Sequence, residues 1–565
     1  MKYHRIVVTI MIGCLMMGMI AQHLKAQPLN RDKKELQAYT ANLPFTMPEL
    51  QFPEIPDRSV TILEFGAVGD GLTMNTRAFA EAIQSCAKAG GGHVVVPSGL
   101  WLTGPIQLAS KIDLHLERGA MILFSKSIDD FPVIRRTPTS KSFRYTPPIS
   151  GFALTDIAIT GEGVIDGSGE VWRYVKKEKY TEREWKELIK SGGVVNEKGT
   201  EWWPSKEAMN GEKYLKELQV QKKDPTAKDF SKAREFLRPD MVEIVGCTRV
   251  LLDGPTFRNS PRFNIHPMEC EHLIIRNITV RNPWNAQNGD GIDIASSHQV
   301  LIYKTVVDVG DDGICLKPGG FGSRKDWKVA CENIVIADCI VYRAHGGFVI
   351  GSESYGGTRN VSVRNCTFID TDIGLRFKTT RDRGGITEKI YIDGIRMKNI
   401  ATDAILFDYY YEEGNTETRV QSEGWRKQEP VTNRTPYFRD FSIRNIVCTG
   451  AKRALAVFGV PESPIKNITL TDVTISAQYG AFFADTEGWM LNRFTLKTTS
   501  GPAFAFLGAK NMTIKDGTVS PSAETGIAVL DDETNGIVVN KVDLSKIKVP
   551  VFFKEKERKG AVTIQ

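Results

Sequence analysis

Apolar residues alternate with polar ones in short stretches that recur from about residue 250 to residue 545. Each stretch is followed by Asn, Asp or Gly and then by a second short apolar stretch. A period of two predicts β-strands rather than helices, and Asn, Asp and Gly tolerate the left-handed backbone of a sharp corner. The stretches begin at residues 273, 300, 334, 361, 390, 441, 468 and 512. The first gaps, of 27, 34, 27 and 29 residues, are typical of coils in a solenoid.

These coils predict an all-β fold, a single-stranded right-handed parallel β-helix whose inward-facing Ile, Val and Leu form one continuous core. The sequence lacks the signatures of propellers and of leucine-rich repeats. Upstream, residues 75–92 place Phe79, Ile83 and Cys86 at helical spacing and end in three glycines. A helix here, followed by a strand at 93–102, would cover the open end of the solenoid and prevent edge-to-edge association.

Two segments interrupt the coil pattern, at residues 176–236 and 412–437. The first is rich in Lys and Glu, has weak helical periodicity and contains Trp202 and Trp203; the second contains Trp425. Loops of this length in a compact domain are usually functional or disordered. On general grounds we interpret both charged runs as solvated surface.

The N-terminus has the pattern of a secretory signal peptide. A basic start precedes 15 mostly apolar residues, Ile6 to Ile20, and Leu24-Lys25-Ala26 resembles a cleavage site. A membrane span needs about 20 apolar residues, and no later stretch reaches that length. The alternative is a lipoprotein anchored at Cys14, but the apolar run continues past that residue. The prediction is therefore an exported protein, periplasmic or extracellular, without a membrane span.

This interpretation divides the chain into three parts. We expect residues 1–26 to be the signal peptide, 27–59 an N-terminal extension and 60–565 the β-helix domain with its two insertions. The signal peptide carries three of the 73 basic residues, so 70 remain against 67 acidic ones and the formal charge falls from +6 to +3. A nucleic-acid-binding domain would be strongly basic, and we predict no such partner.

Eight of the nine cysteines remain after removal of the signal peptide. Export and an even count would allow disulfides, but several of these cysteines lie within apolar strand-like stretches. Cys315, Cys339 and Cys366 are 24 and 27 residues apart, so we expect them to stack as small buried residues. Since no Cys-x-x-Cys pair is present, we predict no metal site, and nothing in the sequence indicates a cofactor.

Four short segments carry charged and polar residues at coil-like spacing. Asp290 precedes Asp311 by 21 residues, and His345 and Arg376 follow in later coils. Equivalent residues of neighbouring coils lie about 4.8 Å apart in a parallel sheet, so these side chains would converge on one face. The segments are NGDGID at 288–293, VGDDG at 309–313, AHGG at 344–347 and LRFK at 375–378. Such a concentration of charge indicates a catalytic site.

The carboxylates suggest the reaction. Asp290, Asp311 and Asp312 would lie close enough for repulsion to raise the pKa of at least one of them. A protonated acid beside an ionised carboxylate is the arrangement that glycoside hydrolysis requires. A single Asp-Gly pair is commonly a turn, and Asp clusters also bind calcium. Two clusters one coil apart, followed by His345 to orient an acid, favour catalysis.

The basic residues suggest the ligand. Arg376 and Lys378 are two residues apart, so both point to the same face of a strand. They are either ion-pair partners of the carboxylates or ligands for an acidic sugar, whose carboxylate Arg binds through two parallel hydrogen bonds. Lys317, Arg381 and Arg383 extend this local basic patch. The combination predicts a uronate-bearing ligand.

These segments resemble the four motifs of glycoside hydrolase family 28, the polygalacturonases, which cleave pectin. The family's Asn-Thr-Asp, Gly/Gln-Asp-Asp, Gly/Ser-His-Gly and Arg-Ile-Lys elements occur in the same order, and the likeness covers roughly residues 60 to 545. The matching residues are Asn288-Gly289-Asp290, Gly310-Asp311-Asp312, Ala344-His345-Gly346 and Arg376-Phe377-Lys378.

The resemblance implies a catalytic β-helix that hydrolyses α-1,4 bonds between galacturonate residues with inversion. Asp311 would be the general acid, Asp290 and Asp312 would activate the attacking water, and His345 would support the acid. The substrate, a pectic polysaccharide or oligogalacturonide, would be bound by Asn288, Lys317, Arg376, Lys378 and one tyrosine of residues 409–411, for which Tyr409 is the candidate. We expect a monomer, since heptads and other dimer signals are absent.

Several alternatives remain open at this level. The insertions favour exo action, because a walled groove admits only chain ends, whereas an open groove would permit endo action. A rhamnogalacturonan or xylogalacturonan hydrolase would differ in substrate. A pectate lyase is also a β-helix, but it would use a basic residue and usually calcium. A non-catalytic glycan-binding β-helix would leave the three Asp residues unexplained.

Overall fold

The computed structural model describes residues 32–135, 140–319, 330–414, 419, 425–520, 522–558 and 560–565. The chain divides into two compact units, residues 1–50 and 51–565. In the first unit, residues 32–40 are helical. The predicted signal peptide, including Cys14, lies outside the described residues. Within the described ranges, no helix has both the length and the apolar character that crossing a bilayer requires.

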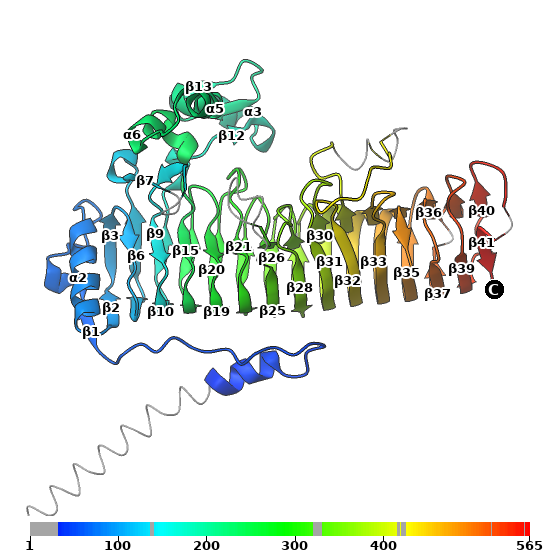
Figure 1. Cartoon of the computed structure of the whole chain (residues 1–565), viewed down its shortest axis with the longest axis horizontal. Helices are drawn as coiled ribbons and strands as arrows, with labels where there is room; N and C mark the ends of the chain where they lie inside the picture. Colours follow the sequence, from blue (N-terminus) through cyan, green and yellow to red (C-terminus); the bar gives the residue numbers. More distant parts are fainter. Residues whose placement is uncertain are drawn as a thin grey trace, which may run out of the picture. The chain divides into compact units, whose positions relative to one another are not determined.

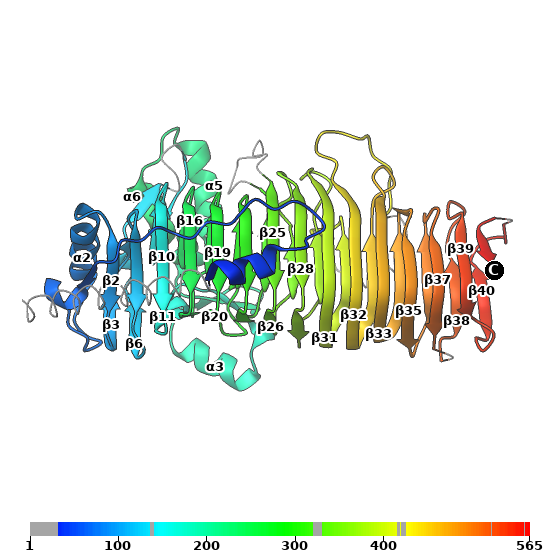
Figure 2. The same cartoon turned by 90° about the horizontal axis from the view of Figure 1, so that it is seen from below.

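Residues 51–565 form a parallel β-helix, which confirms the predicted fold (Figure 1). Each early coil contributes three strands, and each strand pairs in parallel with its counterparts in the neighbouring coils. Three sheets therefore run along the solenoid, and Figure 2 shows the strands of the second sheet side by side. In three successive coils, β31, β32 and β33 each run as one long strand through the sheets, with a shift of register at one corner.

The strands of each sheet are as follows. The first sheet contains β4 (Ile106–Gln107), β9 (Ile149–Phe152), β15 (Val242–Val245), β18 (Ile265–Met268), β21 (Ile292–Ala295), β24 (Ile314–Lys317), β27 (Phe348–Ile350), β30 (Leu375–Lys378), β36 (Pro502–Leu507), β38 (Thr525–Val529) and β40 (Val549–Phe553). The second contains β1 (Ser59–Thr61), β2 (Gly92–Val96), β5 (Ile112–Leu116), β10 (Thr155–Gly161), β16 (Thr248–Asp253), β19 (Glu271–Arg276), β22 (His298–Tyr303), β25 (Cys331–Ala337), β28 (Thr358–Arg364), β35 (Met490–Thr498), β37 (Thr513–Val519), β39 (Ile537–Asp543) and β41 (Val562–Ile564). The third contains β3 (Gly99–Thr103), β6 (Ala120–Phe124), β11 (Val164–Asp166), β17 (Thr256–Arg258), β20 (Thr279–Arg281), β23 (Val306–Asp308), β26 (Ile340–Tyr342) and β29 (Thr367–Ile369). The long strands are β31 (Ile386–Asp408), β32 (Tyr437–Phe458) and β33 (Ile465–Ala484), and β34 (Thr486–Glu487) follows them.

The residues that open each sequence repeat stack in register through the second sheet. Leu273 pairs with Val300, Val300 with Ile334, Ile334 with Val361, and Val361 with Ile390, and all five are buried. Burying an aliphatic side chain contributes about 1.5–3 kcal/mol, so this stack repeats one stabilising unit at every coil. The corners that follow have the predicted left-handed backbone, at Asn277, Asp338 and Asn365 among others.

The predicted N-terminal helix is α2 (Thr76–Lys88). It lies at the end of the solenoid, next to β1 and β2 (Figure 1). The three residues that suggested its apolar face, Phe79, Ile83 and Cys86, are all buried in the common core. The prediction of a cap over the first coil is confirmed.

Most charged side chains of residues 176–236 are exposed, as the interpretation of this run as solvated surface predicts, but the charge pattern did not indicate that the segment is also folded. This insertion is folded, projects from one side of the solenoid (Figure 1), and has an apolar cluster of its own formed by Val175, Trp185 and Trp202. Tyr174 stacks on Trp203 with the ring centroids 4.2 Å apart. The elements are β12 (Val175–Lys176), α3 (Glu182–Lys190), β13 (Val194–Val195), β14 (Glu201–Trp203), α4 (Lys206–Met209), α5 (Gly211–Gln221) and α6 (Ala227–Phe230), beside the hairpin of β7 (Val133–Arg135) and β8 (Phe143–Tyr145).

The second insertion is described only in part, since residues 415–418 and 420–424 lie outside the described ranges. Its described residues pack on the solenoid. Arg419 is buried and donates a 2.7 Å hydrogen bond to Asp408. Trp425 packs edge-on against Tyr410 and Phe458. This part of the insertion is therefore anchored, which the charge pattern did not indicate.

The eight cysteines of the described residues are free and buried, as expected for small apolar residues. Cys339 and Cys366 lie next to one another at equivalent corners. Cys315, however, does not stack with them. It lies within β24, where its thiol contacts the carbonyl of Gly351 at 3.2 Å, because its segment forms the first sheet rather than a corner of the second.

Candidate active site

The turns that lead into first-sheet strands carry the predicted motif residues. In these turns Gly291, Gly313, Gly347 and Gly374 lie one above another, linked by backbone hydrogen bonds between neighbouring turns. The glycines are required by close packing. A Cβ on Gly313 would lie 2.5 Å from Val341, and a Cβ on Gly347 would lie 2.4 Å from the ring of Phe368. The four segments consequently align as NGDGIDIA, GDDGICLK, AHGGFVIG and TDIGLRFK.

This alignment places functional side chains in columns. Asp290 and Asp312 each precede a stacked glycine, whereas Asp311, His345 and Asp372 each lie two residues before one. The backbone N–H of His345 donates to the carbonyl of Asp311 at 3.0 Å. One oxygen from each of the three predicted carboxylates lies within 4.8 Å of the others. The structure thus brings Asp290, Asp311 and Asp312 together as the coil spacing predicts.

Asp312 is the buried, ionised member of this group. Lys378 Nζ donates to Asp312 Oδ2 at 2.6 Å, and Arg376 Nη1 donates to Asp312 Oδ1 at 3.2 Å. Burial raises the pKa of the Asp312 carboxyl, but the charges of Lys378 and Arg376 outweigh burial and hold that pKa below its ordinary value. Both oxygens are therefore engaged by cations.

Asp290 has the opposite electrostatic environment. Burial, reinforced by the charges of Asp293 and Asp311, raises the pKa of the Asp290 carboxyl well above its ordinary value. Its partner is Lys317, whose Nζ lies 3.6 Å from Asp290 Oδ2 and 3.4 Å from Asp293 Oδ1. Burial also raises the pKa of Asp293, to about 7. Burial and mutual repulsion thus make the charged forms of Asp290 and Asp293 less favourable than that of an exposed carboxylate.

Asp311 is the most exposed of the three carboxylates, with 14% of its side chain accessible against 4% for Asp290 and 2% for Asp312. His345 Nδ1 lies 3.4 Å from Asp311 Oδ1, and the backbone N–H of Asn288 donates to Asp311 Oδ2 at 3.1 Å. Burial raises the pKa of Asp311, but the hydrogen bond and charge of His345 outweigh it, so the pKa lies below its ordinary value. Asp311 and His345 therefore form a close pair at the accessible side of the group.

The predicted basic patch separates into three parts. Arg376 and Lys378 lie at the carboxylates, and the ring of Tyr411 lies 4.7 Å from Lys378 Nζ and 5.6 Å from the Arg376 guanidinium. Lys317 lies among carboxylates as their counter-ion. Arg381 and Arg383 point elsewhere, into ion pairs with Glu462 and Glu412 respectively.

Tyr409 is not a substrate-lining residue, contrary to our candidate assignment. It is fully buried, and its hydroxyl accepts a hydrogen bond from the backbone N–H of Phe438. Tyr411 is the exposed member of the three consecutive tyrosines, at 36%, and it is the one beside Arg376 and Lys378. The three tyrosines could not be separated in sequence because the strand ends at Asp408, after which alternation no longer determines which way a side chain points.

Sequence reasoning missed four residues of the site. Lys179 and Arg238 come from the first insertion and the segment that follows it, so no periodicity indicated them. Arg238 Nη2 donates to Asn288 Oδ1 at 2.7 Å and so holds the residue that contacts Asp311. Asp372 and Asp293 occupy columns of the aligned segments, and aligning TDIGLRFK and NGDGIDIA residue by residue would have identified them.

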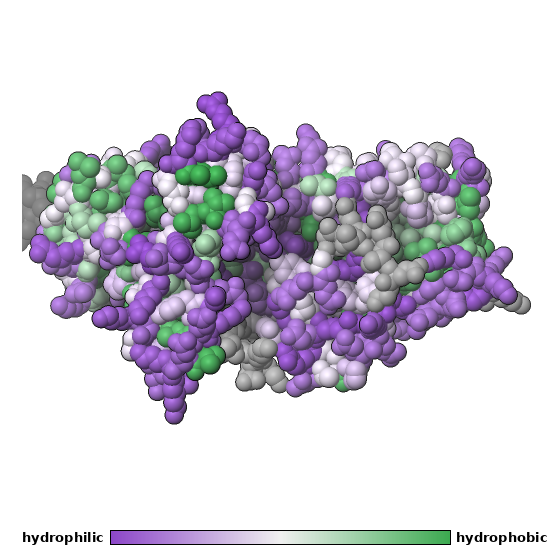
Figure 3. All heavy atoms as spheres, turned by 90° about the horizontal axis from the view of Figure 1, so that it is seen from above, coloured by the Kyte–Doolittle hydropathy of each residue, from purple (hydrophilic) through white to green (hydrophobic). Residues whose placement is uncertain are grey.

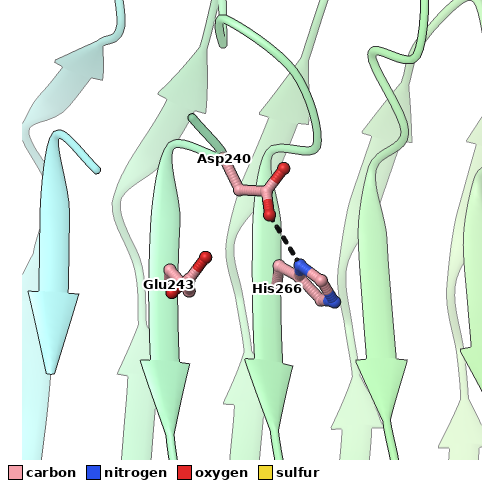
Figure 4. A group of neighbouring side chains, drawn as sticks. All are labelled: Asp240, Glu243 and His266. Atoms are coloured by element: carbon pink, nitrogen blue, oxygen red, sulfur yellow. Dashed lines mark hydrogen bonds and ion pairs between the residues drawn. The ribbon is translucent and has the colours of Figure 1, made fainter. Parts of the chain in front are cut away.

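A second charged cluster lies further along the same sheet. His266 on β18 donates or accepts a 2.8 Å hydrogen bond with Asp240, and Glu243 on β15 pairs with His266 in register (Figure 4). Arg144 forms two hydrogen bonds with Glu243, and Arg262 lies 3.6 Å from Asp240. This cluster lies at β15 and β18, the first-sheet strands that precede β21, and so extends the row of polar residues toward the N-terminal end of the solenoid.

Both carboxylate clusters are close enough to be considered as metal centres. Asp290, Asp311 and Asp312 form one such group, and Asp240, Glu243 and His266 form another. Cations of the protein already neutralise each group, namely Lys317, Arg376 and Lys378 in the first and Arg144 and Arg262 in the second. We therefore assign neither group as a metal centre.

A pocket of about 570 Å³ opens beside Asn288. Its lining combines arginines of the solenoid and hairpin with aromatic residues in and next to the insertion, including Arg144, Arg238, Arg262, Tyr174 and Trp203. The face from which the insertion projects is largely hydrophilic (Figure 3). Of the residues at the carboxylates, the pocket lining includes Asn288, whose backbone N–H donates to Asp311.

Fold and site together define a β-helix glycoside hydrolase. The chain matches the model of glycosyl hydrolases family 28 over residues 183–480, and it belongs to that family. It is 31% identical to an exopolygalacturonase from Thermotoga maritima, with a TM-score of 0.62, covering 80% of this chain and 95% of that one.

Curated relatives agree with this assignment. The chain is 28% identical to a probable polygalacturonase of Vitis vinifera over 74% of each protein. It is 26% identical to an exo-poly-alpha-D-galacturonosidase of Dickeya chrysanthemi, over 82% of this chain and 75% of the relative.

Proposed function

We propose that the protein hydrolyses α-1,4 bonds between galacturonate residues of pectic polysaccharides or oligogalacturonides. The observation that carries this proposal is the position of Asp311. It is the accessible carboxylate of a three-carboxylate group and lies next to His345, while Arg376 and Lys378 lie on the same face. An acid, a base and two cations for a uronate are thus assembled within one family 28 fold.

In this proposal Asp311 protonates the leaving oxygen with the proton that it shares with His345. Asp312 is the base, because Lys378 and Arg376 keep it ionised. Asp290 holds the attacking water through its carboxyl group, whose pKa is raised. Arg376, Lys378 and Tyr411 bind the sugar at the scissile bond, where the two cations attract its carboxylate.

We infer that the enzyme acts from chain ends. The first insertion brings Lys179 to His345 and contributes side chains to the pocket beside Asn288, so we expect a long polymer to meet protein on that side of the carboxylates. The Thermotoga maritima and Dickeya chrysanthemi relatives carry exo-acting names, which supports the same inference. A groove closed at one end admits a chain terminus and excludes an internal segment.

We expect monomer to be the first product from polygalacturonic acid in the presence of a chelator, with new reducing ends and no rise in the ultraviolet absorbance of unsaturated sugars. Chromatography of early time points tests the exo inference, since a ladder of oligomers would contradict it. A rise in the ultraviolet absorbance of unsaturated sugars that disappears when chelator is added would identify a lyase and contradict hydrolysis.

We expect the first product to be the β-anomer, because inversion of an α-linkage produces it. One oxygen of each of the three carboxylates lies within 4.8 Å of the others, which is closer than the roughly 6.5–9.5 Å typical of inverting pairs. Taken alone, this short distance would favour retention of configuration. Our expectation of inversion follows instead from the resemblance of the four motifs to family 28, to which the chain belongs. Proton NMR of the product as it forms distinguishes inversion from retention. An initial α-anomer would contradict inversion and show that a carboxylate attacks the sugar.

A further inference from the structure

Lys179 reaches the candidate active site from outside the solenoid. It ends a 3-10 turn, η4 (Lys177–Lys179), in the first insertion. Its Nζ donates to the carbonyl of Gly310 at 2.8 Å and lies 4.4 Å from the centre of the Trp284 ring. The same nitrogen lies 3.4 Å from His345 Nε2, on the side of the ring that faces away from Asp311.

Asp372 approaches the same imidazole nitrogen from the next coil. Its Oδ2 lies 3.5 Å from His345 Nε2, and its side chain is 36% exposed. An ammonium group can only donate a hydrogen bond, whereas a carboxylate can only accept one. Lys179 therefore favours an unprotonated Nε2, and Asp372 favours a protonated Nε2. The two residues act on one atom in opposite senses.

We propose that Lys179 and Asp372 are opposing positioning residues, whose balance on His345 Nε2 sets the pH at which the Asp311–His345 pair loses the proton delivered to the leaving group. This inference rests on the proposed function. It assigns a role in the reaction to the insertion that goes beyond limiting access to the groove.

The sign of each effect follows from charge. A cation at Nε2 makes proton loss from the pair easier, and an anion makes it harder. The other titratable or charged groups that act on Asp311 among the described residues include Asp290, Asp312, Tyr174, Lys317, Lys378 and Arg376. Those groups are the same in variants of Lys179 and in variants of Asp372. They therefore do not alter the difference in the pH of proton loss that is expected between the two kinds of variant.

The first test is the pH profile of kcat/KM on a short oligogalacturonide. Lys179→Met should move the alkaline limb to higher pH, and Asp372→Asn should move it to lower pH, each by about one unit. Lys179→Arg retains the charge and should leave the limb near its wild-type position. Lys190→Met is the matched control, because Lys190 is an exposed lysine of the same insertion whose ion pair is with the exposed Glu187, and it should not shift the profile.

The proposal would be overturned if the alkaline limb moved in the same direction in Lys179→Met and Asp372→Asn. It would also be overturned if the limb did not move in either variant and only KM rose. A limb position does not depend on the fraction of folded enzyme, so partial loss of folded protein does not obscure the result. The ring-nitrogen chemical shifts of His345, followed by NMR without substrate and assigned with His345→Gln, provide a readout independent of activity. They should move in opposite directions in the two variants. If wild type cleaves no galacturonan while these shifts occur, the proposed function fails, and only the opposing action of Lys179 and Asp372 on His345 Nε2 is supported.

Discussion

Replacing Asp311 by Asn is expected to reduce kcat on polygalacturonate by roughly 10²–10⁴-fold, the usual contribution of a general acid. The amide keeps the shape of the side chain and the hydrogen bond from Asn288, so KM should change far less than kcat. The accessible position of Asp311 is the physical reason, since Asp290 and Asp312 are too buried to reach a leaving oxygen first. Initial rates of reducing-end formation provide the measurement.

A matched control for this variant is Asp338→Asn. Asp338 lies at an exposed left-handed corner, a conformation that Asn also tolerates, so its replacement should leave kcat unchanged. Asp311→Asn enzyme that retained more than a tenth of wild-type kcat would show that another group donates the proton. Isothermal titration with an oligogalacturonide would confirm that the variant still binds substrate.

The largest expected effect on stability comes from Arg144→Met, which should lower the free energy of unfolding by about 3–5 kcal/mol. Arg144 and Glu243 are both buried and hydrogen-bonded to one another, so loss of the guanidinium leaves a buried carboxylate without its partner. The second replacement in Arg144→Met/Glu243→Gln removes that charge and should recover a large part of the loss. Urea unfolding of the two single variants and the double variant measures the interaction free energy between Arg144 and Glu243. Additive effects of the two replacements would contradict this prediction.

The pH dependence of that stability has a defined sign. Burial raises the pKa of Asp240, but Arg262, His266 and Arg144 outweigh it and hold that pKa below its ordinary value of 3.8. A lowered folded-state pKa stabilises the protein above the unfolded pKa and ceases to do so as the pH falls through the folded value. The contribution of Arg144 acting through Asp240 should thus be complete near neutral pH and decline only in strong acid.

Much of the fold follows from local repetition. The apolar residues that open each repeat stack in register, and the Asn and Asp residues after them form left-handed corners. Since every coil repeats the same short-range pattern, a wrong assignment of one coil from the sequence does not change the assignment of the others. The coil period also placed Asp290, Asp311, Asp312 and His345 together, because residues one coil apart must be neighbours in a parallel sheet.

Contacts made by the insertions did not follow from the sequence. The charged run at 176–236 indicated a solvated surface, and most of its charges are exposed, but it did not show that the segment packs around Trp185 and Trp202 or that Lys179 reaches His345. The wrong choice of Tyr409 over Tyr411 has a related cause, since both lie beyond the end of β31, where the strand pattern stops. Periodicity gives no information about a chain once it leaves the coil.

The amino-acid sequence by itself thus determined the β-helix, its capping helix, the family and the three-carboxylate group. Only the tertiary structure decided which tyrosine faces the cations, that Lys317 is a counter-ion, and that Lys179 and Asp372 converge on one imidazole nitrogen. The physical reason is the range of the interactions. Coil positions are set by neighbouring residues and repeated hydrogen bonds, whereas Lys179 and His345 are 166 residues apart and meet only through the folded path of an insertion.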